Sequence, residues 1–176
     1  MKCCQRPGLT IVLLCINSLV FAGEVTVNFG GGKQQSTSQH NRTYGVDYSF
    51  AQYSRSYRQH FLLGVSLTQI TTDAPTNKTV SAISLYPQLN LYLDKKSLGQ
   101  PFFFVRALGP SYISNNSLGA RDQDHHFSFQ AQVGAGIYLK NGGIVMLSFK
   151  HFSNSNIFEK NDGFDLPAVL SVGKRF

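Results

Sequence analysis

Apolar and polar residues alternate at a period of two along most of the chain beyond residue 22. The clearest run is His126–Leu139, where every second position from Phe127 onward is apolar. The positions between carry serine, glutamine, glycine or tyrosine. Alternation at this period puts one class of side chain on each face of an extended strand. The run therefore predicts a β-strand with one apolar face and one polar or small face.

The same alternation predicts eight strands in all. They cover residues 24–31, 42–53, 58–71, 79–93, 101–113, 125–139, 143–152 and 166–176. Pro87 lies inside the fourth strand, where it removes a ladder hydrogen bond and predicts a bulge. Strands of a soluble sandwich are usually about 5–6 residues long, whereas membrane strands need about 9–11. The longer runs therefore favour a membrane barrel over a sandwich.

The connections between these strands differ in length. The shorter ones are 54–57, 94–100 and 140–142, and they alternate with mostly longer polar ones at 32–41, 72–78, 114–124 and 153–165. Short turns at one end and longer loops at the other are typical of bacterial outer-membrane barrels, and the terminal Phe176 agrees with that class. An even strand number closes the sheet and leaves no edge in lipid.

These features predict an all-β fold, an eight-stranded antiparallel transmembrane β-barrel of the bacterial outer membrane. A barrel of eight strands has a lumen just wide enough for side chains, so no pore is expected.

The N-terminal segment has the form of a secretory signal. Lys2 and Arg6 precede a short apolar core, Leu9–Val20, which is too short to cross a bilayer as a helix. Small residues at Val20 and Ala22 predict cleavage after Ala22. The predicted organisation is a signal peptide over residues 1–22 and a single barrel domain over 23–176. All three cysteines lie in the signal segment, so the barrel has no disulfide.

Charge adds a partner class to this description. Charged residues make up only 14% of the chain, where about a quarter is usual for a soluble domain. The formal net charge of +7 suits an anionic partner such as an acidic lipid or a phosphorylated glycan. Aromatic residues alternating with polar ones, without a basic helix, argue against nucleic acid.

Candidate chemistry is concentrated in residues 150–165. His151 and Ser153 are two positions apart on the predicted lipid-facing side of the seventh strand, so their Cα atoms lie roughly 6.5–7 Å apart. At that separation an imidazole can reach a serine hydroxyl, the geometry of base-assisted nucleophilic attack. The structural alternative is a histidine of the membrane girdle beside a serine that caps the loop.

The longer motif is more specific. The order His151-Phe-Ser153-Asn154, then Asn161-Asp-Gly163, an acid at 165 and a final strand resembles the lipid A 3-O-deacylase family (PagL-like outer-membrane enzymes). The close match is confined to this C-terminal stretch. The rest agrees in kind, with a signal segment, eight amphipathic strands and small size.

The resemblance implies a serine esterase that removes the 3-O-linked hydroxyacyl chain from lipid A of lipopolysaccharide. It implies Ser153 as nucleophile and His151 as general base. The family's acid is a glutamate, and the aligned residue here is Asp165, one methylene shorter. Glu159 and Asp162 are the alternative acids. No metal or cofactor is implied.

The supporting residues leave several points open. Asn154 and nearby backbone N–H groups are candidates for the oxyanion site, and Asn161 for the same site or for turn formation. By parity Asp165 faces the lumen if the eighth strand runs unbroken, so meeting His151 requires a later strand start or a bulge. Lys150, Arg121 and Lys160 are candidate contacts for lipid A phosphates.

The expected location is the bacterial outer membrane, with the active site at the outer leaflet. The expected partners are lipid A and outer-membrane lipids, with a homodimer as an alternative to a monomer. Two other functions compete with the esterase. One is a non-enzymatic small barrel for adhesion or membrane integrity, which has no need of Ser153. The other is an acyltransferase barrel, which would hold an acyl chain in its lumen.

Overall fold

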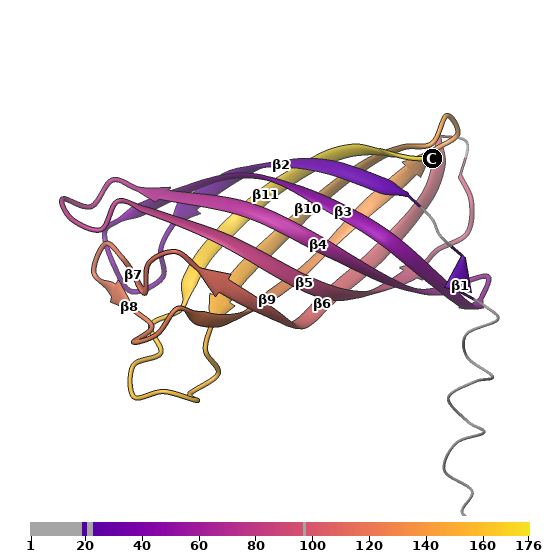
Figure 1. Ribbon diagram of the computed structural model, residues 1–176. Coiled ribbons are helices and arrows are strands. Elements are labelled where there is room, and N and C mark those ends of the chain that lie inside the picture. Colours follow the sequence, from indigo (N-terminus) through magenta and orange to yellow (C-terminus); the bar gives the residue numbers. More distant parts are fainter. Residues whose placement is uncertain (1–18, 21–22, 97) are drawn as a thin grey trace, which may run out of the picture.

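The computed structural model describes residues 19–20, 23–96 and 98–176. The predicted signal peptide lies outside the described residues, except for the two-residue strand β1 (Leu19–Val20). Within the described part of the chain, no helix is long and apolar enough to cross a membrane. Figure 1 shows one closed wall of strands, with the C-terminus at one end and the β7–β8 hairpin at the other.

Eight long antiparallel strands form this wall. They are β2 (Glu24–Lys33), β3 (His40–Ser56), β4 (Gln59–Thr72), β5 (Thr79–Tyr92), β6 (Gly99–Ile113), β9 (Phe127–Leu139), β10 (Gly143–Ser153) and β11 (Phe164–Arg175). Each pairs with the next along the chain, and β11 pairs with β2. The eight-stranded antiparallel barrel predicted from alternation is confirmed.

The predicted strand ranges need small corrections. All eight strands are present, but several extend further into the loops, most clearly β3 at both ends. The hairpin formed by β7 (Ser117–Leu118) and β8 (Arg121–Asp122) was not predicted, because two-residue strands leave no periodic pattern. Strand β1 was not predicted either; it lies inside the segment assigned to the signal peptide and pairs with β3.

The barrel is apolar on its outer wall, and its buried side chains include a large polar group. Its large exposed side chains include Phe29, Leu67, Phe103 and Leu147, which all project from strands toward the surroundings. Its buried side chains include many serines, threonines, asparagines and glutamines that line the lumen. An apolar outer band around an interior that holds the polar side chains is the arrangement that a bilayer requires of a barrel.

The lumen is filled in three layers. Aromatic and aliphatic side chains from Tyr92 to Met146 close the end that holds the termini. A second apolar cluster, which includes Phe152 and Phe164, closes the loop end. Between them lies a polar layer centred on Arg106 and Asp47, whose Nη1 and Oδ2 atoms are 2.5 Å apart. The predicted filled lumen is therefore the one that the structure shows.

The central ion pair supplies a stability prediction. Asp47→Ala would leave the buried Arg106 guanidinium without its carboxylate, and removing one partner of a buried pair costs about 3–5 kcal/mol. Asp94→Ala is the matched control, because it breaks the exposed Arg58–Asp94 pair, worth about 0–1 kcal/mol. Urea unfolding of the barrel in detergent should separate the two variants. Equal midpoints would contradict a structural role for the central pair.

The irregularity expected at Pro87 is present. Pairing between β5 and β6 shifts register between Ser84 and Gln88, around the proline. The extra residue belongs to β6, where pairing with β9 also shifts between Arg106 and Gly109. The missing N–H of Pro87 thus lies opposite a bulge in the neighbouring strand.

Candidate active site

A second bulge decides where Asp165 lies. Ser148 of β10 pairs with Val169 of β11, and Lys150 pairs with Leu166, so two steps on β10 match three on β11. The extra residue falls at Pro167–Ala168, both exposed. One additional residue reverses the inside–outside alternation of the strand before it. Asp165 therefore lies on the outer face, directly opposite His151, which resolves the parity question left open by the sequence.

The glycines of β2 make room for this bulge. Gly31 and Gly32 have φ angles of 147° and 144°, a region that side chains rarely adopt. A Cβ at Gly32 would approach the Pro167 ring to 3.2 Å. The glycine run therefore accommodates the close approach of β11.

His151 and Asp165 form a directed pair. The His151 Nδ1 and Asp165 Oδ1 atoms are 2.8 Å apart, and the Asp165 side chain is only 10% exposed. The aspartate side chain, one methylene shorter than a glutamate, reaches the His151 imidazole because the two residues are register partners on adjacent strands. With Nδ1 directed at a carboxylate, Nε2 is the nitrogen left to face a substrate or a nucleophile.

Ser153 shares the outer face of β10 with His151. Its side chain is half-buried at the end of the strand, next to the loop 154–163. Among the described residues, no hydrogen bond within 3.5 Å joins the Ser153 hydroxyl to the His151 ring. Catalytic hydrogen bonds of unliganded enzymes are often long and shorten only when substrate binds. The arrangement thus has a formed His–Asp pair and a serine placed two positions away.

Asn154 and Asn161 hold the loop that follows β10. Asn154 is fully buried and donates from Nδ2 to the backbone carbonyls of Gln123 and Lys160, at 2.9 and 2.5 Å. Asn161 Oδ1 accepts the Asn154 backbone N–H at 2.9 Å. The Asn161 Nδ2 group donates to Asn156 Oδ1 at 2.8 Å. Both side-chain amides are engaged in this way, so the geometry favours positioning over a direct oxyanion contact.

The alternative acids are placed elsewhere. Asp162 pairs with Arg121 at 3.7 Å, and its backbone N–H donates to the Asp122 carbonyl at 3.0 Å. Glu159 is exposed in the loop. Of the three candidate acids, Asp165 is the one that contacts the imidazole.

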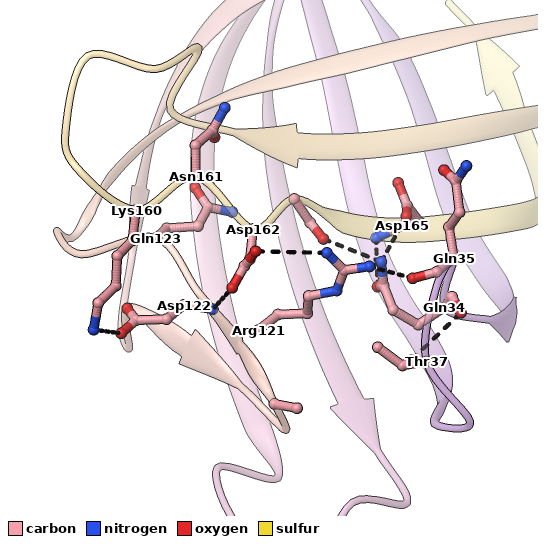
Figure 2. Close-up of polar contacts among 12 residues, drawn as sticks. Gln34, Gln35, Thr37, Arg121, Asp122, Gln123, Lys160, Asn161, Asp162 and Asp165 are labelled. Atoms are coloured by element: carbon pink, nitrogen blue, oxygen red, sulfur yellow. Dashed lines mark hydrogen bonds and ion pairs between the residues drawn. The ribbon is translucent and has the colours of Figure 1, made fainter.

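Polar contacts of Arg121 and Lys160 join three loops at the end of the barrel that carries the site, and the sequence did not predict these contacts. Figure 2 shows Arg121 extended between Asp162 and Gln35, whose backbone oxygen accepts a hydrogen bond from Nη2. Lys160 and Asp122 form a second contact at 2.8 Å. This hydrogen bond lowers the pKa of Asp122 and raises the pKa of Lys160. The predicted phosphate contacts Arg121 and Lys160 thus have carboxylate partners.

The third predicted phosphate contact was wrong. Lys150 is buried in the lumen, where its Nζ lies 3.2 Å from Thr68 Oγ1. Its neighbours Phe149 and His151 face outward, so alternation turns Lys150 inward.

Gln34 is a further residue that the sequence did not single out. Its fully buried amide donates to Asp165 Oδ2 at 2.6 Å and to the Gly163 carbonyl at 3.1 Å. It comes from the loop after β2, 131 positions away from Asp165. No local pattern could have linked the two residues.

A groove of about 450 Å³ opens on the outer wall beside His151 and Asp165. The small side chain of Ala131 lies opposite His151 on β9 and leaves space there. The apolar side chains along the groove are Val105, Ala107, Ala131, Val133 and Phe149. A groove with several apolar side chains beside a histidine–carboxylate pair suits a ligand with a hydrocarbon chain and a reactive polar end.

Comparisons with known proteins agree with this arrangement. The family model described as lipid A 3-O-deacylase (PagL) matches residues 42–171. The crystal structure of the outer membrane enzyme PagL is similar at a TM-score of 0.66 with 18% identity, covering 86% of this chain and 98% of that chain. Neisserial surface protein A (NspA) gives 0.53 and 13%, covering 89% and 97%. At these identities the two structures show the fold alone. No curated protein sequence matches significantly.

Proposed function

The chain belongs to the lipid A 3-O-deacylase (PagL) family, and from that premise we propose that it hydrolyses the ester of the 3-O-linked hydroxyacyl chain of lipid A. The observation that carries the proposal is the His151–Asp165 contact of 2.8 Å, made on the outer wall of a barrel beside an apolar groove. A site on that wall lets an ester approach laterally, without leaving the membrane.

The proposed chemistry uses Ser153, His151 and Asp165. His151 Nε2 takes the proton of Ser153 Oγ as the oxygen attacks the ester carbonyl carbon. Asp165 keeps the proton on Nδ1 and stabilises the imidazolium that forms. The tetrahedral intermediate then collapses, the ester C–O bond breaks, and His151 returns the proton to the sugar oxygen.

The second half of the cycle regenerates the serine. A water molecule gives a proton to His151 and attacks the acyl-Ser153 carbonyl. The hydroxy fatty acid leaves, and Ser153 Oγ recovers its proton from the imidazolium. The groove along Val133 and Phe149 would hold the hydrocarbon chain during both steps. Asn154 and Asn161 act as positioning residues that keep the loop after Ser153 in place.

The proposal includes a location. Bacterial outer-membrane barrels have short periplasmic turns and longer external loops. The end that carries the site also carries the longer loops, so the site would face the outer leaflet, where lipid A lies. The filled lumen speaks against the acyltransferase reading, since packed side chains occupy the space that an acyl chain would need.

The test is mass spectrometry of lipid A from cells that express the wild type or Ser153→Ala. Wild type should remove one ester-linked hydroxyacyl chain, and Ser153→Ala should lose that activity by a factor of about 10⁶, since removing a triad nucleophile has that effect. Ser38→Ala, an exposed serine of another loop at the same end, is the control and should behave as wild type.

Three outcomes would separate the competing functions. Loss of the acyl chain in wild type alone supports the esterase and its nucleophile. Loss in both would keep the reaction and remove Ser153 from it. No loss in either, with folded barrels shown by heat-modifiable gel mobility, would favour the adhesive or structural reading.

A further inference from the structure

The polar atoms of Asp165 are all engaged. Oδ1 lies 2.8 Å from His151 Nδ1, and Oδ2 accepts from Gln34 Nε2 at 2.6 Å. The Asp165 backbone N–H donates to Gln34 Oε1 at 2.9 Å, and its carbonyl accepts from Asn41 Nδ2 at 3.0 Å. Three of these four contacts come from Gln34 and Asn41, at the far end of the chain sequence.

The side-chain amide of Gln34 uses all of its hydrogen-bonding groups. Its Nε2 donates to Asp165 and to Gly163, while its Oε1 accepts from the Asp165 N–H and from Asn41 Nδ2 at 2.7 Å. A glutamine amide has two donor hydrogens and one acceptor oxygen with two lone pairs, so its capacity is used completely. The side chain is 0% exposed. A side chain so held has one orientation, and it imposes one on the carboxylate.

We propose that Gln34 is a positioning residue for the reaction: it sets the direction in which Asp165 faces His151. The inference rests on the proposed function and deepens it. A carboxylate held at one oxygen alone can rotate about its last bond and misdirect the imidazole. Gln34 removes that freedom, because it bonds the second carboxylate oxygen, the Asp165 backbone N–H and the carbonyl of Gly163. Gln34 also lies before residues 42–171, the part matched by the family model.

The test compares Gln34→Leu with Gln39→Leu. Both replace a buried amide of the same loop by a side chain of similar size. Gln39 bonds Leu118, Ala120 and the Oδ1 atom of Asn41, and it makes no direct hydrogen bond to Asp165 or His151. Gln34→Leu should lower kcat about 10²-fold, the usual effect of misplaced reacting groups, with KM within about threefold of wild type. Gln39→Leu should retain most of kcat. Gln34→Glu keeps the size and polarity of the side chain, and should also lower kcat because it sets a second carboxylate against Oδ2.

A spectroscopic readout separates this inference from the deacylase proposal. A proton on His151 Nδ1, shared with the Asp165 carboxylate, should give a downfield proton resonance in the barrel held in micelles, without substrate. Gln34→Leu should broaden or shift that resonance, while Gln39→Leu should leave it in place. If the wild type has no deacylase activity but Gln34→Leu still changes the resonance, the proposed function is overturned and the role of Gln34 in orienting Asp165 is kept. Wild-type kcat and an unchanged resonance in Gln34→Leu would overturn that role.

Basic side chains are in excess at the opposite end of the barrel, which holds the termini. The described residues at the end that holds the termini carry seven basic and two acidic side chains, a net charge of +5, while the loop end carries five basic and six acidic ones, a net charge of −1. The basic residues of the first group are Arg55, Arg58, Lys95, Lys96, Lys140, Lys174 and Arg175. The positive surplus of the chain is therefore at the end away from the candidate active site.

Three of these lysines line one pocket. Lys95 and Lys96 from the β5–β6 connection and Lys140 from the β9–β10 turn border a hollow of about 370 Å³. Within the described ranges, none of the three lies within 4.0 Å of a carboxylate oxygen. Leu98, which precedes the lining residue Gly99 in the chain, is 75% exposed. Unpaired ammonium groups beside an exposed apolar side chain match an anionic head group with its hydrocarbon attached.

We infer that this pocket binds the phosphate of an anionic lipid in the leaflet that surrounds the terminal end. The ammonium groups meet the phosphate oxygens, and the acyl chains run along the wall past Leu98. The same chemistry could be met by free phosphate, so the experiment must distinguish the two sources.

Native mass spectrometry of the barrel, released from micelles that contain phosphatidylglycerol and phosphatidylcholine, tests this site. Wild type should retain phosphatidylglycerol preferentially, and Lys140→Gln should weaken that retention about fivefold. Arg55→Gln removes the same charge at the same end outside the pocket and should have little effect. Excess inorganic phosphate should leave the lipid bound, and displacement of the lipid would overturn its assignment in favour of free phosphate. Equal retention of both lipids, or equal loss in the two variants, would overturn the site.

Discussion

Replacing Asp165 with alanine is expected to lower kcat/KM for lipid A deacylation by about 10⁴-fold, since a triad without its acid loses the imidazole tautomer and the stabilisation of imidazolium. The structure supplies the reason that this residue, of the three nearby acids, carries the effect. Asp165 contacts His151 Nδ1 at 2.8 Å, whereas Asp162 is engaged by Arg121. The measurement is release of hydroxy fatty acid from purified lipid A in detergent.

Three variants sharpen that result. Glu159→Ala and Asp162→Ala remove the alternative acids and should each retain activity within about tenfold of wild type, the range of a slightly displaced loop. Asp165→Glu keeps a carboxylate and restores the residue type of the family, so it should keep activity. The acid would have to be sought elsewhere if Asp165→Ala hydrolysed lipid A as fast as the parent.

Gly163→Ala is expected to lower kcat about 10²-fold, because the added methyl group would displace the His151 ring. A Cβ at this position would lie 3.0 Å from Nε2 and closer still to Cε1. Real Cβ atoms are rarely found so near, so either the imidazole or the loop must move. A shift of about 1 Å in a reacting group typically has an effect of this size.

The control for that variant lies on the same strand as His151. Gly143→Ala makes the same chemical change at the other end of β10, where the nearest atoms belong to the side chains of Asn141 and Leu139. It should leave kcat unchanged. A Gly163→Ala enzyme with wild-type kcat, and with folding confirmed by circular dichroism, would show that the imidazole tolerates displacement and would contradict the need for a fixed His151 ring.

Alternation along the chain was enough to predict the wall of the barrel. A strand in a bilayer must be apolar on its outer face. The apolar character of Phe127, Val133 and Leu139 at alternate positions therefore predicts that they face outward. The placement of His151 on the outer face followed from the same rule. The same rule places Lys150 in the lumen. The prediction that Lys150 contacts a lipid A phosphate failed because it considered the charge of the residue and not its position in the alternation.

Interactions across long distances in the sequence left no such trace. The hydrogen bond from Gln34 to Asp165 joins residues 131 positions apart, and the ion pair of Arg121 with Asp162 joins two loops. Loop residues have no periodic pattern, and their hydrogen-bond partners depend on how the loop ends meet in space. The roles of these side chains could not be read from any local motif.

Thus the sequence by itself determined the fold class and the eight strands, because both depend on neighbours one or two positions away. The candidate catalytic groups came from the resemblance of residues 151–165 to a known family. The tertiary structure alone decided that Asp165 meets His151. The bulge at Pro167–Ala168 shifts the pairing of β10 and β11 by one residue and thereby reverses the face of every residue before it on β11. That register depends on the glycines of β2 and on the closed barrel, which are set only when distant strands have paired.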